Sequence, residues 1–300
     1  MTAAARGRRT ALLATLTLLA MTACWGSTFY LIHDLLDRVP AVDFLAVRFG
    51  IASLAMLLVA PRAIERLDPQ VRKHAVVLGA LYGVAQILQT VGLGHTEASV
   101  SGFVTGMYVV LTPLFAAVIL RTRIGSLTWV AVALAIGGLA VLTLQGLSVG
   151  YGEGLTLIAA ALYALHIVGL GGWSSPADAI GMSILQCLVI TAICFVAAVP
   201  GGIALPDRTS DWLAVVYMAL FAGAAALLGQ TWAQAHLAPT RSAIIMSMEP
   251  VFAAFFAVLL GGESVTARIL LGGALVLAAM ITVELVPRRR IEGEVQHLAV

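Results

Sequence analysis

The chain has 300 residues, of which 61% are hydrophobic and 11% are charged, and its formal net charge is +2. A soluble domain is about 45–50% apolar and about 25% charged, so this composition excludes an ordinary water-soluble domain and indicates a membrane protein. The small basic excess does not predict nucleic-acid binding, because the arginines stand in short segments between apolar runs, where they report topology.

The first apolar run follows residues 6–9, a segment that holds three arginines. Basic residues followed by an apolar stretch and Cys24 are typical of a signal peptide. The apolar run continues past this cysteine to residue 32, so we interpret it as an uncleaved first helix. Cys187 and Cys194 also fall inside apolar stretches, without the spacing of a metal site or a disulfide framework.

Apolar runs of about 20 residues, the length that crosses a hydrocarbon core of about 30 Å, follow one another along the whole chain. Short connections join them, so no domain outside the membrane is expected. The predicted fold class is an all-α integral membrane protein with ten transmembrane helices. Their expected spans are residues 10–32, 41–60, 75–95, 98–120, 127–146, 154–172, 179–199, 211–235, 241–261 and 267–286.

The positions of the basic residues predict the orientation of these helices. If the N-terminus is cytoplasmic, 13 of the 17 basic residues lie in inner segments and three lie in outer loops, while Arg48 lies inside a span. Cytoplasmic loops carry the excess of Lys and Arg. We therefore expect a multi-pass protein of the plasma or inner membrane, with both termini in the cytoplasm.

The two halves of the sequence resemble each other at a nearly constant spacing. Similar positions are separated by between 137 and 141 residues. The matched positions are Trp25 with Tyr163, Arg48 with Gln186, Gln89-Thr90-x4-His95 with Gln230-Thr231-x4-His236, and Pro113 with Pro250. We expect two five-helix repeats, residues 10–146 and 154–286, followed by a short cytoplasmic tail, residues 287–300.

A repeat of five helices crosses the membrane an odd number of times, so the second repeat must be inverted relative to the first. Inverted repeats are frequent in secondary transporters, because two such halves can exchange conformations around one site. Some channels share this plan, so the architecture favours transport without excluding a channel.

Several short motifs, in this order, resemble the drug/metabolite transporter superfamily, EamA type, over roughly residues 15–286. They are Trp25-Gly-Ser-Thr-Phe, Arg48, His95-Thr-Glu-Ala-Ser, Pro113, Met248-Glu249-Pro250 and Gly262-Glu263. The resemblance implies ten helices in two EamA repeats, a central cavity, and export of small metabolites, amino acids or drugs. The first half departs from the pattern, because Arg121-Thr-Arg123 stands where a counterpart of Gly262-Glu263 is expected, which argues against a symmetric role for Glu263.

Glu249 is the main candidate for proton coupling. An ionisable group inside a span is costly to insert, by at least about 2.5–3.5 kcal/mol, so it is treated as a functional candidate. We expect Glu249 about nine residues into the ninth helix, next to Pro250, which cannot donate to the Met246 carbonyl. Pro113 and Pro250 are the expected helix breaks. The alternative for Glu249 is a neutral, hydrogen-bonded structural carboxyl.

Arg48 lies about seven residues into the second helix and is a candidate anion-binding group. Its guanidinium suits a substrate carboxylate or phosphate. The alternatives are that Arg48 extends toward the membrane surface or ties helices together.

Polar side chains three and four residues apart share one face of a helix. Tyr82, Gln86 and Gln89 do so on the third helix, and Gln230 and Gln234 do so on the eighth. These stripes predict cavity walls, with hydrogen bonds between helices as the alternative. Thr105, Tyr108 and Thr112 form a weaker stripe on the fourth helix.

Trp25, Tyr163 and His166 lie on the first and sixth helices, which open the two halves. Aromatic side chains in a cavity suit apolar or aromatic solutes, whereas interfacial anchoring is the alternative for Trp and Tyr. His166 is a candidate ligand or proton-sensing group, with an ordinary hydrogen-bonded histidine as the alternative.

We expect no metal, no cofactor and no enzymatic activity. His95 and His236 should lie near opposite faces, the Gly150–Gly154 run lacks the context of a nucleotide loop, and no catalytic cluster is evident. The favoured function is a secondary transporter that exports small metabolites, amino acids or drug-like solutes by alternating access, with proton coupling as a hypothesis. A channel and an uptake carrier for an anionic small molecule are the alternatives. The expected partners are a small-molecule substrate and the lipid bilayer, with a homodimer left open.

Overall fold

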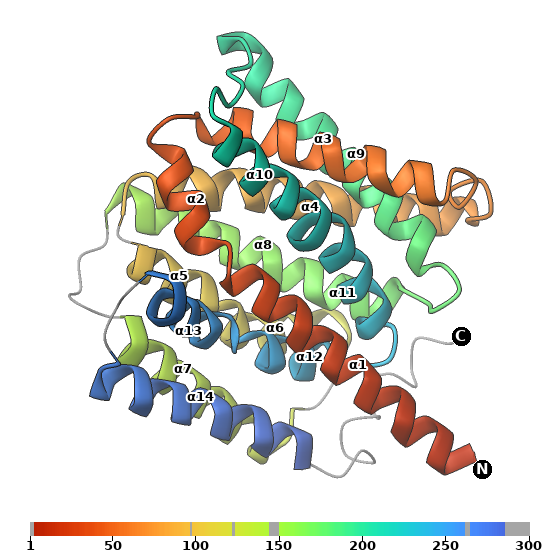
Figure 1. Cartoon of the computed structure of the whole chain (residues 1–300). Coiled ribbons are helices and arrows are strands. Elements are labelled where there is room, and N and C mark those ends of the chain that lie inside the picture. The colour runs from red at the N-terminus through yellow and green to blue at the C-terminus, as the bar shows by residue number, and fades with distance from the viewer. Residues whose placement is uncertain (1–2, 97, 122–123, 144–149, 262–264, 286–300) are drawn as a thin grey trace.

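The computed structural model describes residues 3–96, 98–121, 124–143, 150–261 and 265–285, and every element among them is helical (Figure 1). Glu263, the Arg288–Arg290 run and the expected tail lie outside the described residues. The helices are α1 (Ala3–Gly26), α2 (Phe29–Leu36), α3 (Ala41–Val59), α4 (Pro69–Leu93), α5 (Ala98–Gly106), α6 (Tyr108–Ile119), α7 (Ser126–Thr143), α8 (Tyr151–Trp173), α9 (Ala179–Ala198), the 3-10 helix η1 (Val199–Gly201), α10 (Thr209–Tyr217), the π-helix η2 (Met218–Ala225), α11 (Ala226–Gln234), α12 (Pro239–Met246), α13 (Glu249–Gly261) and α14 (Ala267–Leu285).

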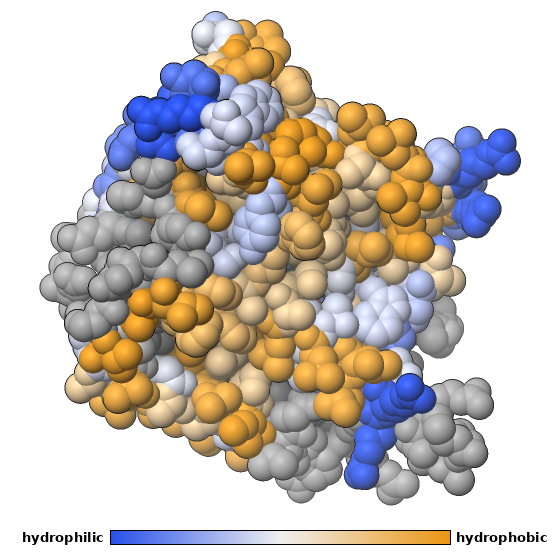
Figure 2. Space-filling model, in the orientation of Figure 1, coloured by the Kyte–Doolittle hydropathy of each residue, from blue (hydrophilic) through white to orange (hydrophobic). Residues whose placement is uncertain are grey.

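Six helical segments of the described chain are long and apolar enough to cross a membrane, and three shorter apolar segments accompany them. The six are Gly7–Gly26, Ala41–Val59, Pro69–Leu93, Tyr151–Trp173, Ala179–Gly201 and Thr209–Gln234, and the three are Val104–Ile119, Ser126–Val141 and Leu270–Thr282. Apolar side chains cover the middle of the surface in Figure 2, with hydrophilic side chains gathered at opposite sides. The expected all-helical membrane fold is confirmed, and the count of ten crossings stays a prediction.

Four of the ten expected spans consist of more than one helical segment. The first span is divided into α1 and α2 at Ser27 and Thr28. Ser27 Oγ donates to the Cys24 carbonyl at 2.7 Å, and Thr28 Oγ1 donates to the Trp25 carbonyl at 2.8 Å. Such local bonds from hydroxyls offer the backbone an alternative to the regular helix ladder.

Of the two expected helix breaks, the structure has one directly before Glu249 and Pro250 and none at Pro113. The fourth span divides at Met107, and Pro113 lies inside α6, which continues to Ile119. The ninth span divides at Ser247 and Met248, so Pro250 is the second residue of α13. Proline fits the first turn of a helix because its missing N–H would have no partner there. Pro250 therefore begins a helix instead of interrupting one.

The contacts between helices repeat when the two halves are exchanged. The pair α1 with α11 corresponds to α8 with α4, and α3 with η2 corresponds to α9 with α4. The pairs α3 with α9 and α7 with α14 correspond to themselves, and both are in contact. Figure 1 shows α7 and α14 side by side along one edge, with α3 and α9 at the opposite edge.

Two contacts between α3 and α9 join residues that hold equivalent positions in the two halves. Ser53 Oγ and Thr191 Oγ1 are 2.8 Å apart and are separated by 138 residues in the chain. Cys187 Sγ lies 3.9 Å from the Phe49 carbonyl oxygen, again with a separation of 138. A residue contacts its own counterpart only beside a two-fold axis, so a pseudo-two-fold axis passes between α3 and α9.

Glycines on α4 allow the close approach of α9. A Cβ atom at Gly79 would lie 2.9 Å from the Gln186 carbonyl oxygen, and one at Gly83 would lie 3.3 Å from Ile190 Cα. Small residues allow membrane helices to pack with their backbones close together. The α4–α9 contact therefore keeps the Gln186 side chain buried.

Candidate functional site

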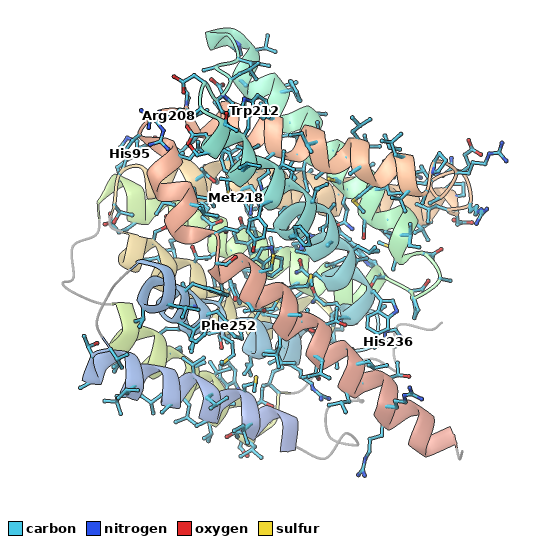
Figure 3. The ribbon with its side chains drawn as sticks, viewed as in Figure 1. His95, Arg208, Trp212, Met218, His236 and Phe252 are labelled. Carbon is cyan, nitrogen blue, oxygen red and sulfur yellow. The ribbon has the colours of Figure 1, made fainter. Side chains whose placement is uncertain are left out.

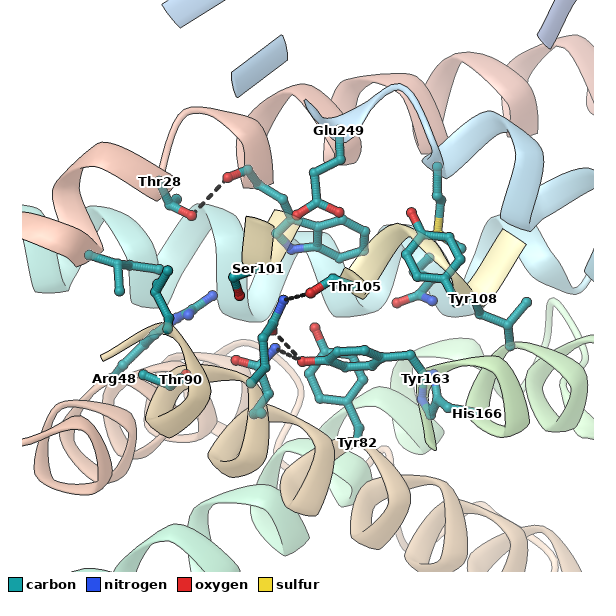
Figure 4. Close-up of a pocket in the computed structure, with 18 residues that line it drawn as sticks. Thr28, Arg48, Tyr82, Thr90, Ser101, Thr105, Tyr108, Tyr163, His166 and Glu249 are labelled. Carbon is teal, nitrogen blue, oxygen red and sulfur yellow. Dashed lines mark hydrogen bonds between the residues drawn. The ribbon is translucent and has the colours of Figure 1, made fainter. Parts of the chain in front are cut away.

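A cavity lies between the two halves and is lined by α1 to α6, α8 and α11 to α13 (Figure 4). These elements belong to the first, second, third, fourth, sixth, eighth and ninth expected spans. The cavity and its mouth hold about 800 Å³ of space free of protein atoms. Its lining combines aromatic side chains with a few convergent polar groups, which is the character of a small-molecule site.

The structure places most of the expected site residues around this one cavity. The expected residues that line it are Trp25, Arg48, Tyr82, Gln86, Gln89, Tyr108, Tyr163, His166, Gln230 and Glu249. Gln234, Pro113 and Pro250 are not part of the lining. That the lining residues bind a substrate stays a prediction.

Eight further lining residues were not proposed as binding residues from the sequence. They are Thr28, Ile32, Thr90, Leu93, Ser101, Thr105, Ile167 and Met246. Helical spacing could have predicted that some of them line the cavity. Thr90 lies four residues after Gln86 and Ser101 lies four residues before Thr105, so the members of each pair share a helix face. The apolar members carried no such signal, since an apolar residue in a membrane helix can face lipid, protein or a cavity.

Tyr163 on α8 joins two glutamines of α4 through its hydroxyl. Gln86 Nε2 donates to Tyr163 Oη at 2.6 Å, and Tyr163 Oη donates to Gln89 Oε1 at 2.7 Å. Gln89 Nε2 donates in turn to Thr105 Oγ1 on α5, at 3.1 Å. This chain of hydrogen bonds fixes one polar wall of the cavity across three helices.

Arg48 on α3 forms part of the lining although only 4% of its surface is exposed. Its Nη2 atom donates to the Ala222 carbonyl at 3.1 Å, and the same carbonyl accepts a hydrogen bond from Trp25 Nε1 at 3.0 Å. The guanidinium carbon lies 5.1 Å from the centre of the Phe49 ring. Arg48 Nε has no hydrogen-bond partner among the described residues, so the guanidinium retains donor capacity.

Ala222 lies in the π-helix η2, which interrupts the helix formed by α10 and α11. In a π-helix the backbone hydrogen bonds run over five residues, and such segments are frequent at functional sites. Here the π-helix presents a carbonyl that holds both Arg48 and Trp25. The sequence did not predict this interruption.

Glu249 begins α13, directly after the break that ends α12. Its side chain points into the cavity, opposite Tyr82 and Tyr163 (Figure 4). Glu249 was expected about nine residues into the ninth helix, but it is the first residue of α13 because the chain leaves the helix at Ser247 and Met248.

Glu249 and Arg48 do not pair with each other. Among the residues that the structure describes, Glu249 has no hydrogen-bond partner and no ion-pair partner. A carboxyl that lines a cavity without a partner is available to a proton or to a bound solute.

His166 is fully buried and contacts Gln186, the counterpart of Arg48 in the second half. His166 Nε2 and Gln186 Oε1 are 2.9 Å apart, and the imidazole lies 5.0 Å from the centre of the Tyr82 ring. His166 Nδ1 and Gln186 Nε2 have no partner within the described part of the chain. The two equivalent positions therefore differ in kind, with a cation in one half and a neutral amide in the other.

Gln234 lies one turn beyond Gln230 on α11, outside the lining. Gln230 Nε2 donates to Gln234 Oε1 at 3.0 Å, and Gln234 Nε2 donates to the Ile167 carbonyl at 3.1 Å. In this structure the Gln234 amide connects α11 to α8, which is the hydrogen bond between helices given as the alternative, and its role as a substrate contact stays a prediction.

His95 and His236 lie at opposite sides of the molecule (Figure 3). In each, Nδ1 lies 2.9 Å from the carbonyl oxygen four residues earlier, that of Val91 or Trp232. The two histidines thus make the same contact at the ends of equivalent helices.

A family model described as the EamA-like transporter family matches residues 12–144 and again residues 150–285. An uncharacterized transporter of Archaeoglobus fulgidus is 29% identical over 279 residues, which cover 91% of this chain and 86% of that protein. The uncharacterized inner membrane transporter YedA of Escherichia coli K12 is 26% identical over 283 residues, which cover 89% of each chain.

A solved crystal structure also has the same fold. Its TM-score is 0.78 at 18% sequence identity, and the match covers 92% of this chain and 98% of the other. The resemblance of the sequence motifs to the EamA type is confirmed by the family match. The chain belongs to the EamA-like transporter family and is a multi-pass membrane transporter.

Proposed function

We propose that the protein is a secondary carrier that exports small metabolites, amino acids or drug-like solutes by alternating access. The observation that carries this proposal is the cavity between two halves related by a pseudo-two-fold axis. If the halves are inverted across the membrane, exchange of their conformations exposes the same cavity to the opposite face.

The extent of the cavity favours a carrier over a channel. On α4 the lining runs from Tyr82 to Leu93, the last residue of the helix, whereas on α11 and α12 it ends at Gln230 and Met246. A channel needs a polar path across the whole membrane. A cavity that reaches toward one end of the molecule suits a site with access from one face at a time.

Arg48 is the proposed contact for an anionic group of the solute. Its guanidinium retains donor capacity beside Trp25, and a guanidinium can bind a carboxylate or phosphate through two parallel hydrogen bonds. Trp25, Tyr82, Tyr108 and Tyr163 supply aromatic surface for the remainder of the solute. An uptake carrier for an anionic molecule would use the same contacts, so the direction of transport has to be measured.

Glu249 is the proposed proton carrier. Its carboxyl is in the cavity, where it can take up a proton from one face and release it to the other when access changes. The membrane of residence is proposed to be the inner membrane, in line with the name of the Escherichia coli relative. Both termini are proposed to be cytoplasmic, because most basic residues then lie on the cytoplasmic side.

Profiling of the culture medium tests export and the role of Glu249 together. Cells that express the wild type should accumulate one chemical class of solute outside, relative to cells with an empty vector. Glu249→Gln should abolish this accumulation, because its amide cannot carry a proton, and should preserve exchange of labelled solute across vesicle membranes.

The matched control is Ser53→Ala, which changes a buried polar residue outside the cavity lining and should leave export intact. Medium from wild-type cells that does not differ from the empty-vector medium would contradict export. Equal accumulation with Glu249→Gln would contradict proton coupling through this residue.

A further inference from the structure

We propose that the hydrogen bond of Gln234 to the Ile167 carbonyl holds one end of the carrier closed. The first half has no equivalent hydrogen bond, and this difference favours the conformation with access at the α4–α5 end. This inference rests on the proposed alternating access. It concerns an amide that the sequence suggested as a substrate contact and that the structure places outside the cavity lining.

The repeat identifies which contact must break when access changes. Gln234 on α11 corresponds to Leu93 on α4, at the same separation of 141 residues that relates Gln230 to Gln89. Its partner Ile167 on α8 corresponds to Phe29 at the start of α2, at the separation of 138 that relates Tyr163 to Trp25. Exchange of conformations therefore replaces the contact of Gln234 with Ile167 by a contact of Leu93 with the Phe29 backbone.

The two conformations, each closed at one end of the molecule, cannot have the same stability. Gln234 uses both ends of its amide, accepting from Gln230 and donating to the Ile167 carbonyl, and it is 1% exposed. Leu93 has no hydrogen-bonding group and lines the cavity at the opposite end. The conformation in which Gln234 makes its contact has a hydrogen bond between helices that the exchanged conformation lacks.

Buried hydroxyls on α12 point to the same movement. Ser242 is fully buried and Thr240 is 2% exposed, and neither hydroxyl oxygen has a partner in the described part of the chain. Ser242 corresponds to Thr105, which lines the cavity in the first half. A buried hydroxyl without a partner is costly, and the exchanged conformation would place Ser242 in a hydrated cavity as Thr105 is here.

The contact between Ser53 and Thr191 provides a matched control. It joins equivalent residues across the two-fold axis, so it maps onto itself when the conformations are exchanged. Loss of the Ser53–Thr191 hydrogen bond should therefore lower the stability of both conformations equally. Removal of the Gln234 bond should weaken only one of them.

Thiol labelling of single cysteines measures the two conformations without any substrate. The protein carries Ile32→Cys in the cavity or Ser242→Cys on α12, with the three native cysteines replaced by alanine. A small, charged thiol reagent should label Ile32→Cys, which is partly exposed, readily and Ser242→Cys, which is fully buried, slowly. Gln234→Met, which keeps the length of the side chain without its hydrogen bonds, should raise the labelling ratio of Ser242→Cys to Ile32→Cys about threefold, the effect of one average hydrogen bond between membrane helices.

Leu93→Gln provides a separate test by adding an amide at the opposite end, and it should also raise this ratio. Ser53→Ala should leave the ratio unchanged. An unchanged ratio in folded Gln234→Met and Leu93→Gln proteins would overturn the inference, and loss of solute binding by Gln234→Met at an unchanged ratio would assign Gln234 to the substrate site. Labelling needs no transported solute. A shifted labelling ratio in a protein that exports nothing would therefore support this inference while contradicting the proposed export.

Discussion

Arg48 has one hydrogen bond to the Ala222 carbonyl and is held close to the Phe44 and Phe49 rings. This arrangement fixes the position of the guanidinium without neutralising its charge. The corresponding residue Gln186 is neutral and contacts His166 instead. The cavity is therefore electrostatically asymmetric although its two walls come from related halves.

Arg48→Gln, which makes the two equivalent positions identical, should weaken transport of an anionic solute. A hydrogen bond to a charged group contributes about 1.5–3 kcal/mol, so we expect KM to rise about tenfold or more. Arg48→Lys should have an intermediate effect, because it keeps the charge without the planar fork. Initial rates of efflux from loaded vesicles measure this, and an unchanged KM for Arg48→Gln would contradict an anion-binding role.

Tyr163 is the centre of the hydrogen-bond chain on the other wall. Tyr163→Phe removes the hydroxyl that connects Gln86 to Gln89, and the two amides each lose a partner. We expect a loss of about 1–3 kcal/mol of stability, the cost of leaving a buried polar group unsatisfied. Thermal unfolding in detergent measures it, with Tyr151→Phe as the control because Tyr151 is 67% exposed. Equal unfolding temperatures for the two variants would contradict a stabilising role of this chain of hydrogen bonds.

The candidate lining was partly predictable at the residue scale. Tyr82, Gln86 and Gln89 were found because polar side chains at helical spacing must avoid lipid. Ile32, Leu93 and Met246 were not found. Arg241, one of the basic residues counted in the inner segments, is buried in the first turn of α12, with Nη2 3.5 Å from Thr15 Oγ1. The rule for basic residues describes loops and does not detect such tertiary contacts.

At the scale of the elements, apolar length located the six long and three shorter apolar segments of the described chain, because about 20 apolar residues are needed to cross the hydrocarbon core. The break beside Pro250 was expected, whereas those at Ser27 and Met107 were not. The latter two occur inside apolar windows, and the one at Ser27 is accompanied by local hydroxyl bonds. The π-helix η2 likewise has an ordinary apolar sequence and makes its carbonyl contacts only with α1 and α3.

Gly79 makes the α4–α9 contact testable. Gly79→Ala should destabilise the protein by about 1–3 kcal/mol, because its Cβ would approach the Gln186 carbonyl to 2.9 Å and excess volume in a packed interface causes strain. Gly102→Ala is the control, since nothing lies within 4 Å of a Cβ atom there. It should be neutral or stabilising, because alanine favours a helix more than glycine does. Thermal unfolding of both variants measures these changes in stability. A larger loss of stability for Gly102→Ala than for Gly79→Ala would contradict the described packing of α4 on α9.

At the scale of the whole molecule, the repeat in the sequence anticipated the relation between the halves. The separation of 138 residues found for Trp25 with Tyr163 is the separation between the contacting atoms of Ser53 and Thr191. The sequence could not show that equivalent residues touch, because a constant spacing carries no information about distance in space. The pseudo-two-fold axis follows from the packing of α3 on α9.

Reporter fusions at two positions test most directly the claim that two inverted halves surround one cavity. One reporter is inserted at residue 147, between the halves, and a second follows residue 300. A fluorescent reporter that matures only in the cytoplasm and a phosphatase that is active only in the periplasm are used in turn at each position. The inverted arrangement predicts a periplasmic signal at residue 147 and a cytoplasmic signal after residue 300. The same signal at both positions would contradict the inversion of the second half and, with it, the exchange of conformations on which alternating access depends.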